Sequence, residues 1–560
     1  MCTKAIPRFA ALGTVLLLST ACQELQVENL NEPDRLRALA QPGDLESLLG
    51  STFPNWFDML NNGISGFGDP TTVIGVTGST TSGVSGGSTE VAEEPRRPFR
   101  SEDAPGGPAR IIGSLWRAAH QTTSNAGDYL RTAEELGFTF KEGGQDVTKR
   151  HRAYAKLMQG IGWGFQSLIF DIAVIVPETQ SLSADIKGQS EKNLKTWPEG
   201  IQAAVGALDE AIAIAKANPF PPFPSQNQSR LWFGTPQPIT NAKFQELANT
   251  LAARFLIQGA RTPADRAKLD WNRILGYTAN GLKSDFEVVL VPGVRTSVYN
   301  AKIHNNAPGC PGGSCMRLRY QLLGPADISG AYQNWLKTPI INRTRFNIVT
   351  PDRRITGETP QSPGAYVTWW EDDRGYDAGF GLYHRSAYQW RRHIHEGFAV
   401  NTGTMKQATA DENNLYRAEA LIHLGRLQEA ADLINITRTR ARRLPDGKVY
   451  PGLPPVTAAG VPQSAACVPR TDAGACGDLL VALRYERMLE LVGLDTVRGH
   501  TDARGFGMLI EGTLVHFPVL SNDMQAMGLF EKFGGLAYTF GGVGAPGGAA
   551  YKPVTLANFK

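Results

Sequence analysis

The segment from Asp411 to Arg443 constrains the fold more than any other part of the chain. Apolar residues recur at helical spacing on both sides of Gly425, which marks a tight turn. Asp411 is expected to cap the first helix, with Ala418, Leu421 and Ile422 on its apolar face. The second helix follows an i, i+3, i+4, i+7 pattern through Leu427, Ala430, Ala431 and Ile434. The segment therefore predicts two closely packed antiparallel helices.

The Leu-Gly-Arg-Leu turn at 424–427 is similar to the turn of a tetratricopeptide hairpin. One hairpin cannot bury its own apolar face, so further helix pairs are needed. Helical periodicity recurs at 111–136, 151–175, 197–217, 241–258, 264–282 and 478–492. We therefore expect a mainly α fold of tetratricopeptide-like helical pairs, with long loop-rich insertions and a few short β-strands.

The charge balance gives no sign of a partner that is recognised mainly by its charge. The 560 residues include 56 basic and 53 acidic side chains. Without Lys4 and Arg8 of the N-terminal segment, 54 basic residues remain, for a net charge of +1. This balance gives no reason to expect nucleic acid or an anionic membrane face as the main partner.

Residues 1–21 are predicted to be a cleaved signal peptide. Lys4 and Arg8 precede an apolar run from Phe9 to Leu18, about half the length needed to span a bilayer. The Leu-Ser-Thr-Ala-Cys sequence that ends at Cys22 is similar to a bacterial lipobox. This resemblance implies cleavage before Cys22 and acylation of its thiol, which would anchor the protein to a membrane. The alternative is ordinary cleavage that leaves Cys22 unmodified.

Four further cysteines form two close pairs, Cys310 with Cys315 and Cys467 with Cys476. Both pairs lie in segments rich in Pro, Gly and Ala, which favours two local disulfides in a secreted protein. A four-cysteine zinc site is the alternative, although the spacings do not match a zinc knuckle. We expect the disulfides to staple loops.

Two segments lack helical periodicity. Residues 62–108 form a Gly/Ser/Thr-rich stretch, and residues 285–407 combine Gly, Pro, aromatic and β-branched residues. Short strands are expected in the second stretch, at 298–304, 345–349 and 365–370. Because an insertion on one face of a helical scaffold is a common place for binding residues, we expect a ligand site there.

The most specific pattern lies within residues 478–520, after the last predicted helix begins. Arg484-Tyr485-Glu486-Arg487 is followed by Glu490, Asp502-x-Arg504, Gly507 and Phe517-Pro518. With the lipobox cysteine, Leu251-Ala252-Ala253-Arg254 and the hairpin around Gly425, this run resembles the SusD/RagB family of outer-membrane lipoproteins. The resemblance covers most of residues 22–560 as one ligand-binding domain and is weak near 60–110 and 285–407.

The family resemblance implies a role in nutrient capture. A protein of this kind sits at the cell surface on a TonB-dependent, SusC-like β-barrel transporter. It binds an oligosaccharide or a peptide and passes it inward. It binds without cutting, so no enzyme activity and no cofactor are expected.

Aromatic residues in loop-like segments are candidates for the ligand site, because the apolar faces of sugar rings stack on flat aromatic rings. The alternative for each one is structural packing. Candidates with Asn, Asp or Gln nearby are Trp369, Trp370, Trp335, Tyr299 and Trp232.

Several catalytic and metal patterns have weaker support. Gly83–Gly87 fits a nucleophile elbow, and Gly542–Gly547 fits a dinucleotide fingerprint, but both lack the required strand and helix. His393 with His395 could bind a metal, and Glu371, Asp372, Asp373 and Asp377 could bind calcium. A protein-binding scaffold and a lipid-anchored glycosidase remain as alternative functions.

Overall fold

The structure is a computed structural model of the chain. It describes residues 41–61, 108–225, 231–392 and 402–529, with gaps at 171, 181–185, 292–294, 296–316, 371–384, 493, 495–496, 510–512, 514 and 518.

Helices make up most of the described chain. The long or central ones are α2 (Pro42–Gly50), α3 (Thr52–Asn61), α6 (Pro108–Glu135), α7 (Thr148–Ile169), α9 (Trp197–Ala217), α10 (Asn241–Gly259), α12 (Trp271–Ala279), α17 (Ala410–His423), α18 (Leu427–Arg438), α19 (Leu479–Leu491) and α20 (Arg498–Phe506). Shorter ones are α8 (Ile186–Asn193), α11 (Pro263–Ala267), α14 (Tyr320–Leu323), η1 (Gly324–Ala326), α15 (Ala331–Lys337), η2 (Ile340–Asn342) and α21 (Ser521–Ala526).

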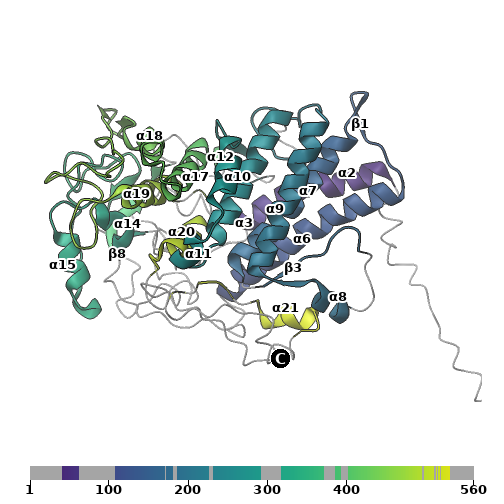
Figure 1. Cartoon of the computed structure of the whole chain (residues 1–560), viewed down its shortest axis with the longest axis horizontal. Coiled ribbons are helices and arrows are strands. Elements are labelled where there is room, and N and C mark those ends of the chain that lie inside the picture. Colours follow the sequence, from purple (N-terminus) through teal and green to yellow (C-terminus); the bar gives the residue numbers. More distant parts are fainter. Residues whose placement is uncertain are drawn as a thin grey trace, which may run out of the picture.

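The helices pack as successive neighbours along an elongated body (Figure 1). Helices α6, α7, α9 and α10 pack side by side at one end, and α12, α17, α18 and α19 continue the series toward the other. Their apolar faces form one large core at the first end and a smaller one among α17, α18 and α19. The predicted mainly α fold with helical pairs and short strands is confirmed.

The predicted hairpin is formed by α17 and α18, which meet at Gly425. This residue has φ +75°, a left-handed conformation that favours glycine at the end of a helix. The Arg426 N–H donates to Leu421 O at 2.8 Å and closes the turn. Ala420, Ala430 and Ala431 are fully buried, as close packing of the two helices requires.

Some predicted boundaries are wrong because side chains outside the apolar pattern determine them. Thr409, not Asp411, caps α17 by accepting from the Glu412 N–H at 3.0 Å. Asp411 instead forms a two-pronged pair with Arg440, at 2.7 Å for both hydrogen bonds. Helix α7 ends at Ile169, where the prediction continued to Ile175.

Strands are short and pair antiparallel. They are β1 (Lys141–Glu142), β2 (Gln145–Asp146), β3 (Ile172–Val174), β4 (Leu194–Thr196), β5 (Phe286–Leu290), β6 (Arg317–Arg319), β7 (Val367–Trp369), β8 (Arg385–Trp390), β9 (Gly403–Ala408), β10 (Arg442–Arg443) and β11 (Val449–Tyr450). Pairs form between β1 and β2, β3 and β4, β5 and β9, and β10 and β11; the one three-stranded sheet described has the order β6-β8-β7.

Pairing of β5 with β9 places the two ends of the long insertion side by side. Phe286 lies opposite Ala408, and Leu290 lies opposite Gly403. The chain between them therefore leaves and rejoins the helical body at one place. Within it, β7 replaces the strand predicted at 365–370, 345–349 is extended without a strand partner, and 298–304 lies outside the described residues.

Helix α19 is held by buried ion pairs on two sides. On one side, the Arg487 guanidinium contacts Glu419 of α17 and donates from Nε to Asp502 of α20 at 3.0 Å. Arg266 also pairs with Glu419, at 2.8 Å from Nη2. Nearby, Arg254 of α10 binds Glu412 of α17 through two hydrogen bonds of 2.7 and 2.8 Å.

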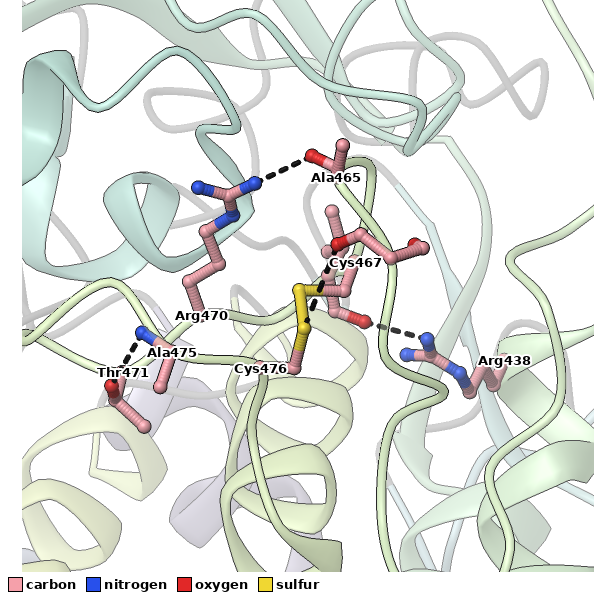
Figure 2. Close-up of a disulfide and its surroundings, with 9 residues drawn as sticks. Arg438, Ala465, Cys467, Arg470, Thr471, Ala475 and Cys476 are labelled. Carbon is pink, nitrogen blue, oxygen red and sulfur yellow. Dashed lines mark hydrogen bonds between the residues drawn. A yellow bond between two sulfur atoms is a disulfide. The ribbon is translucent and has the colours of Figure 1, made fainter.

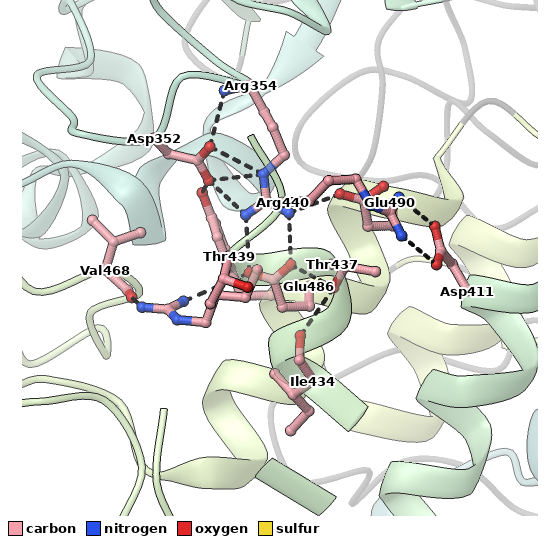
Figure 3. Close-up of polar contacts among 12 residues, drawn as sticks. Asp352, Arg354, Asp411, Ile434, Thr437, Thr439, Arg440, Val468, Glu486 and Glu490 are labelled. Atoms are coloured by element: carbon pink, nitrogen blue, oxygen red, sulfur yellow. Dashed lines mark hydrogen bonds and ion pairs between the residues drawn. The ribbon is translucent and has the colours of Figure 1, made fainter. Parts of the chain in front are cut away.

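On the other side, Arg354 joins α19 to the insertion (Figure 3). Its guanidinium donates to Glu486 at 2.6 Å, to Glu490 at 2.9 Å and to Asp352 at 2.7 Å. The Tyr485 hydroxyl donates to the same Asp352 carboxylate at 2.6 Å. All of these side chains are buried, so water cannot solvate their charges. The opposite charges therefore stabilise one another.

Replacing one carboxylate of this network is expected to be costly. In Glu419→Gln, Arg266 and Arg487 lose their shared charged partner while buried, which we expect to lower the free energy of unfolding by roughly 3–5 kcal/mol. The matched control is Glu429→Gln in the same hairpin, because Glu429 pairs with Arg426 on the surface. Urea unfolding followed by circular dichroism measures both. Equal midpoints for the two variants would contradict the importance of the network.

The same network predicts loss of stability in acid. Burial alone would raise the pKa values of Glu412, Glu419 and Glu490, but the neighbouring arginines overcome it and lower each pKa to about 2. A carboxylate with a lowered folded-state pKa binds fewer protons than in the unfolded chain. The contribution of these three carboxylates to the unfolding free energy should therefore be constant above about pH 5 and fall steadily toward pH 2. Urea midpoints at several pH values test this; a flat profile from pH 5 to pH 3 would contradict it.

Candidate functional site

The outer part of the β6-β8-β7 sheet presents an aromatic ring beside an amide. Trp369 is half-buried at the end of β7, and its indole Nε1 donates to Asn347 Oδ1 at 3.2 Å. Asn347 is exposed. This pair combines a flat ring with an amide that retains donors and acceptors for a ligand.

The strand sets the position of Trp369. In β7, Val367 lies opposite Trp390, and Trp369 lies opposite Tyr388. Side chains two residues apart share a face, so Trp369 lies on the face where Val367 is fully buried. Part of the indole packs against a further apolar core, which includes Val367, Tyr388 and Trp390, and the remainder is accessible.

The loop that carries Asn347 is held on both sides by buried side chains. The Tyr320 hydroxyl accepts from the Phe346 N–H at 2.8 Å and donates to Phe346 O at 2.7 Å. The Tyr388 hydroxyl accepts from the Ile348 N–H at 2.8 Å, so the peptide groups flanking Asn347 are both fixed. Burial raises the pKa of Tyr320 to about 12, which keeps its hydroxyl neutral and able to donate and accept together.

A buried carboxylate completes the support. Asp327 accepts from the Val349 N–H at 3.1 Å and from the Tyr332 N–H at 3.2 Å. Because the supporting groups lie on α14, on β8 and directly after η1, the Asn347 loop is fixed from three places. The arrangement can stack a ring on Trp369 and hydrogen-bond its substituents, with little ordering needed on binding.

Two of the predicted ligand residues lie in the core. Trp232 is 3% exposed and packs against His151, Tyr154 and Phe223. Trp335 is 4% exposed and lies in α15, with the Arg343 guanidinium 4.2 Å from its ring. Both were expected in exposed loops. This placement corrects that expectation, because the apolar area of each ring is used in packing.

The remaining predicted aromatics have different outcomes. Trp370 follows β7 directly, is half-buried, and donates its backbone N–H to Ala387 O at 2.6 Å. Tyr299 lies outside the described residues. Of the five candidates, the adjacent Trp369 and Trp370 lie at one sheet edge, and the alternation of strand side chains places them on opposite faces. Asn347 was missed by sequence reasoning, because a single asparagine in an extended segment carries no periodic signal.

One predicted disulfide is present, between Cys467 and Cys476 (Figure 2). Its Cα atoms are 5.7 Å apart, and it closes a loop that precedes α19. Cys22 and the predicted pair of Cys310 and Cys315 lie outside the described residues.

The catalytic and metal patterns of the sequence cannot be placed. Gly83–Gly87, Gly542–Gly547, both histidines at 393 and 395, and the acidic cluster at 371–377 lie outside the described residues. Among the residues that are described, no group of three or more His, Cys, Asp and Glu side chains could hold a metal ion. In that same part of the chain, no helix has the length and apolar character needed to cross a bilayer.

An open cavity of about 880 Å³ lies along α7 and α9. Its central cation, Lys156, is already paired with Glu178 at 2.6 Å and with Glu210 at 2.7 Å. Trp163 contributes little ring surface, because it is 6% exposed. This cavity is therefore a weaker candidate than the Trp369–Asn347 pair.

Comparison with solved structures identifies the fold. A SusD superfamily protein from Parabacteroides distasonis ATCC 8503 matches with a TM-score of 0.53 and 10% identity, over 87% of this chain and 97% of that one. Surface glycan-binding protein A from Bacteroides uniformis matches with a TM-score of 0.51 and 13% identity, over 87% of this chain and 98% of the other. No family model and no curated protein matches the sequence. The expected SusD-like fold is confirmed.

The support of the Asn347 loop can be tested through Asp327. Asp327→Ala leaves the buried Tyr332 N–H and the Val349 N–H without their acceptor, which we expect to cost about 1–3 kcal/mol for an unsatisfied group. Asp446→Ala is the control, because Asp446 accepts one backbone N–H in an exposed turn. Thermal unfolding and Trp fluorescence of the two variants give the comparison. Unchanged stability in Asp327→Ala would show that the loop is held by other contacts.

Proposed function

We propose that this protein belongs to the SusD/RagB family and is a cell-surface lipoprotein that binds a glycan. The observation that carries the proposal is the Trp369–Asn347 pair on a supported loop, within a fold shared with a surface glycan-binding protein. Carbohydrate recognition needs both parts of this pair. Fold similarity alone would not suffice, because one fold hosts many functions.

The chemistry of the pair suits a neutral sugar. The partly buried indole offers a flat apolar surface to the C–H face of a pyranose ring. Asn347 offers one acceptor and two donors to neighbouring hydroxyls. Tyr320 and Tyr388 hold the peptide groups on both sides of Asn347, so its amide is presented in a defined place.

The lipid anchor and the transporter are parts of the same proposal. Acylation of Cys22 would tether the domain to the outer membrane, with residues after Cys22 as a spacer. A TonB-dependent, SusC-like barrel is the proposed recipient of the glycan. Support for both comes from the lipobox and the family resemblance. A pure protein-binding scaffold is less well supported, since a half-buried indole beside an exposed amide on a fixed loop is typical of a small-ligand site.

Direct titration tests glycan binding. We expect saturable binding of at least one oligosaccharide in a calorimetric screen of neutral plant, fungal and host glycans. Trp369→Ala removes the stacking surface and should weaken that binding about tenfold or more, since such aromatic anchors contribute 1–3 kcal/mol. The double variant with Trp370→Ala should bind at least as weakly, and helical content should remain intact.

Ile436→Ala serves as the matched control, because Ile436 is 44% exposed on α18, far along the chain from the site. Unchanged affinity in the double tryptophan variant would remove both residues from the site. Release of reducing ends during titration would favour the glycosidase alternative. Co-purification of a TonB-dependent barrel from gently solubilised membranes would support the transport role, and its absence after cross-linking would oppose it.

A further inference from the structure

A separate small pocket lies between α14, α19 and the disulfide loop that ends at Cys476. Its volume is about 240 Å³, below the range of roughly 300–1,000 Å³ that suits a drug-sized ligand. Most of its walls are apolar, from Leu322, Pro325, Val481, Met488 and Met508. It shares no lining residue with the Trp369–Asn347 pair.

The loop wall of this pocket is fixed before any ligand binds. The Cys467–Cys476 disulfide closes the loop. The backbone N–H of Arg470 donates to the backbone oxygen of Pro325, on the opposite wall of the pocket, at 2.7 Å. Within the loop, the Thr471 N–H donates to Ala475 O at 2.8 Å. Figure 2 shows Arg470, Thr471 and the disulfide on this loop. A rigid wall of this kind lowers the ordering cost of binding.

Arg484 differs from the other charged residues of α19, because no ion pair is formed by its side chain within the described residues. Glu486, Arg487 and Glu490 on the same helix are buried in short ion pairs. Arg484 is one of the residues that line the pocket, and its guanidinium carbon lies 5.1 Å from the centre of the Phe506 ring. Its buried Nε has no hydrogen-bond partner in the described part of the chain, and the same holds for Nε of Arg470. The Arg470 guanidinium donates from Nη2 to Ala465 O at 2.5 Å, which leaves Arg484 as the better candidate to bind an anion.

Glu419 and Asp478 favour the charged form of Arg484 electrostatically, but their hydrogen bonds are to other groups. Glu419 binds Arg266 and Arg487, and Asp478 caps α19 by accepting from the Val481 N–H at 2.8 Å. Asp472 also lines the pocket but is an exposed residue of the loop. Burial is the main cause that lowers the pKa of Arg484, and a bound anion would offset the cost of that burial.

We propose that this pocket binds a small organic carboxylate with an apolar body. The carboxylate would pair with Arg484, a group whose planar fork matches two carboxylate oxygens. The apolar body, of the size of one phenyl ring, would contact the aliphatic and methionine walls. A neutral sugar fits this pocket poorly, because its hydroxyls would face those apolar walls without partners.

The experiment uses the full mature chain and two matched probes, 3-phenylpropionate and its uncharged amide, 3-phenylpropionamide. Ligand-observed NMR titration should show saturable binding of the carboxylate and much weaker binding of the amide. Arg484→Gln should weaken carboxylate binding about tenfold or more, as expected for loss of a charged hydrogen-bonding partner. Asp472→Asn should strengthen it, because a repelling charge is removed.

Arg426→Gln is the control for a general charge effect, since Arg426 pairs with Glu429 on the surface of the hairpin. It should leave carboxylate binding unchanged. Equal binding of acid and amide, or equal weakening in Arg426→Gln and Arg484→Gln, would overturn the proposal. If Arg484→Gln lowers the melting temperature, Asp472→Asn still decides, because a weaker or unchanged affinity in that variant contradicts an anion site. Glycan titration of the same variants keeps this test separate from the proposed glycan function.

Discussion

The paired burial of arginine and carboxylate side chains around α19 is the interaction on which the rest of the structure depends. Arg487 connects α19 to Glu419 of α17 and Asp502 of α20, while Arg354 connects Glu486 and Glu490 of α19 to the insertion. Removal of any member would leave a charge in a medium that solvates it poorly. Since each carboxylate has more than one partner, the helical body and the insertion must assemble together. The network therefore favours one arrangement of the two parts more than it adds to stability.

This constraint explains where binding groups can occur. A charge that belongs to the network is already satisfied and offers nothing to a ligand. Side chains that can still bind a ligand lie outside the network: Trp369 and Asn347 at the edge of the sheet, and Arg484 on α19 between the buried Leu483 and Tyr485. Both places are supported by buried groups, the tyrosine hydroxyls in one case and the disulfide loop in the other. Because their supports are rigid, Trp369, Asn347 and Arg484 would need little ordering to bind a ligand.

Sequence reasoning succeeded where local periodicity determines structure. The helix at 197–217 has the predicted bounds, and the hairpin turns at Gly425 as predicted. It failed where the deciding contact is distant in sequence: Trp232 is buried by His151 and Tyr154, and Arg354 meets Glu486 132 residues later. Asn347 belongs to the same class, because its value comes from Trp369 and two distant tyrosines. The alternation of apolar and polar residues carries no information on such pairs.

The sequence predicts a ligand site in the insertion for a general reason, and the pairing of its two ends offers a specific reason for that proposal. Strands β5 and β9 return the chain to its point of departure, so the insertion can vary without disturbing the helical series. Its sheet is packed on α19 through Tyr366, whose hydroxyl donates to Glu490 at 2.9 Å. The residues at the exposed edge of this sheet can change while its contact with α19 holds the sheet in place. Such a surface can adapt to different ligands. On this argument the fold determines where a ligand binds, and the few exposed side chains at the sheet edge determine which one.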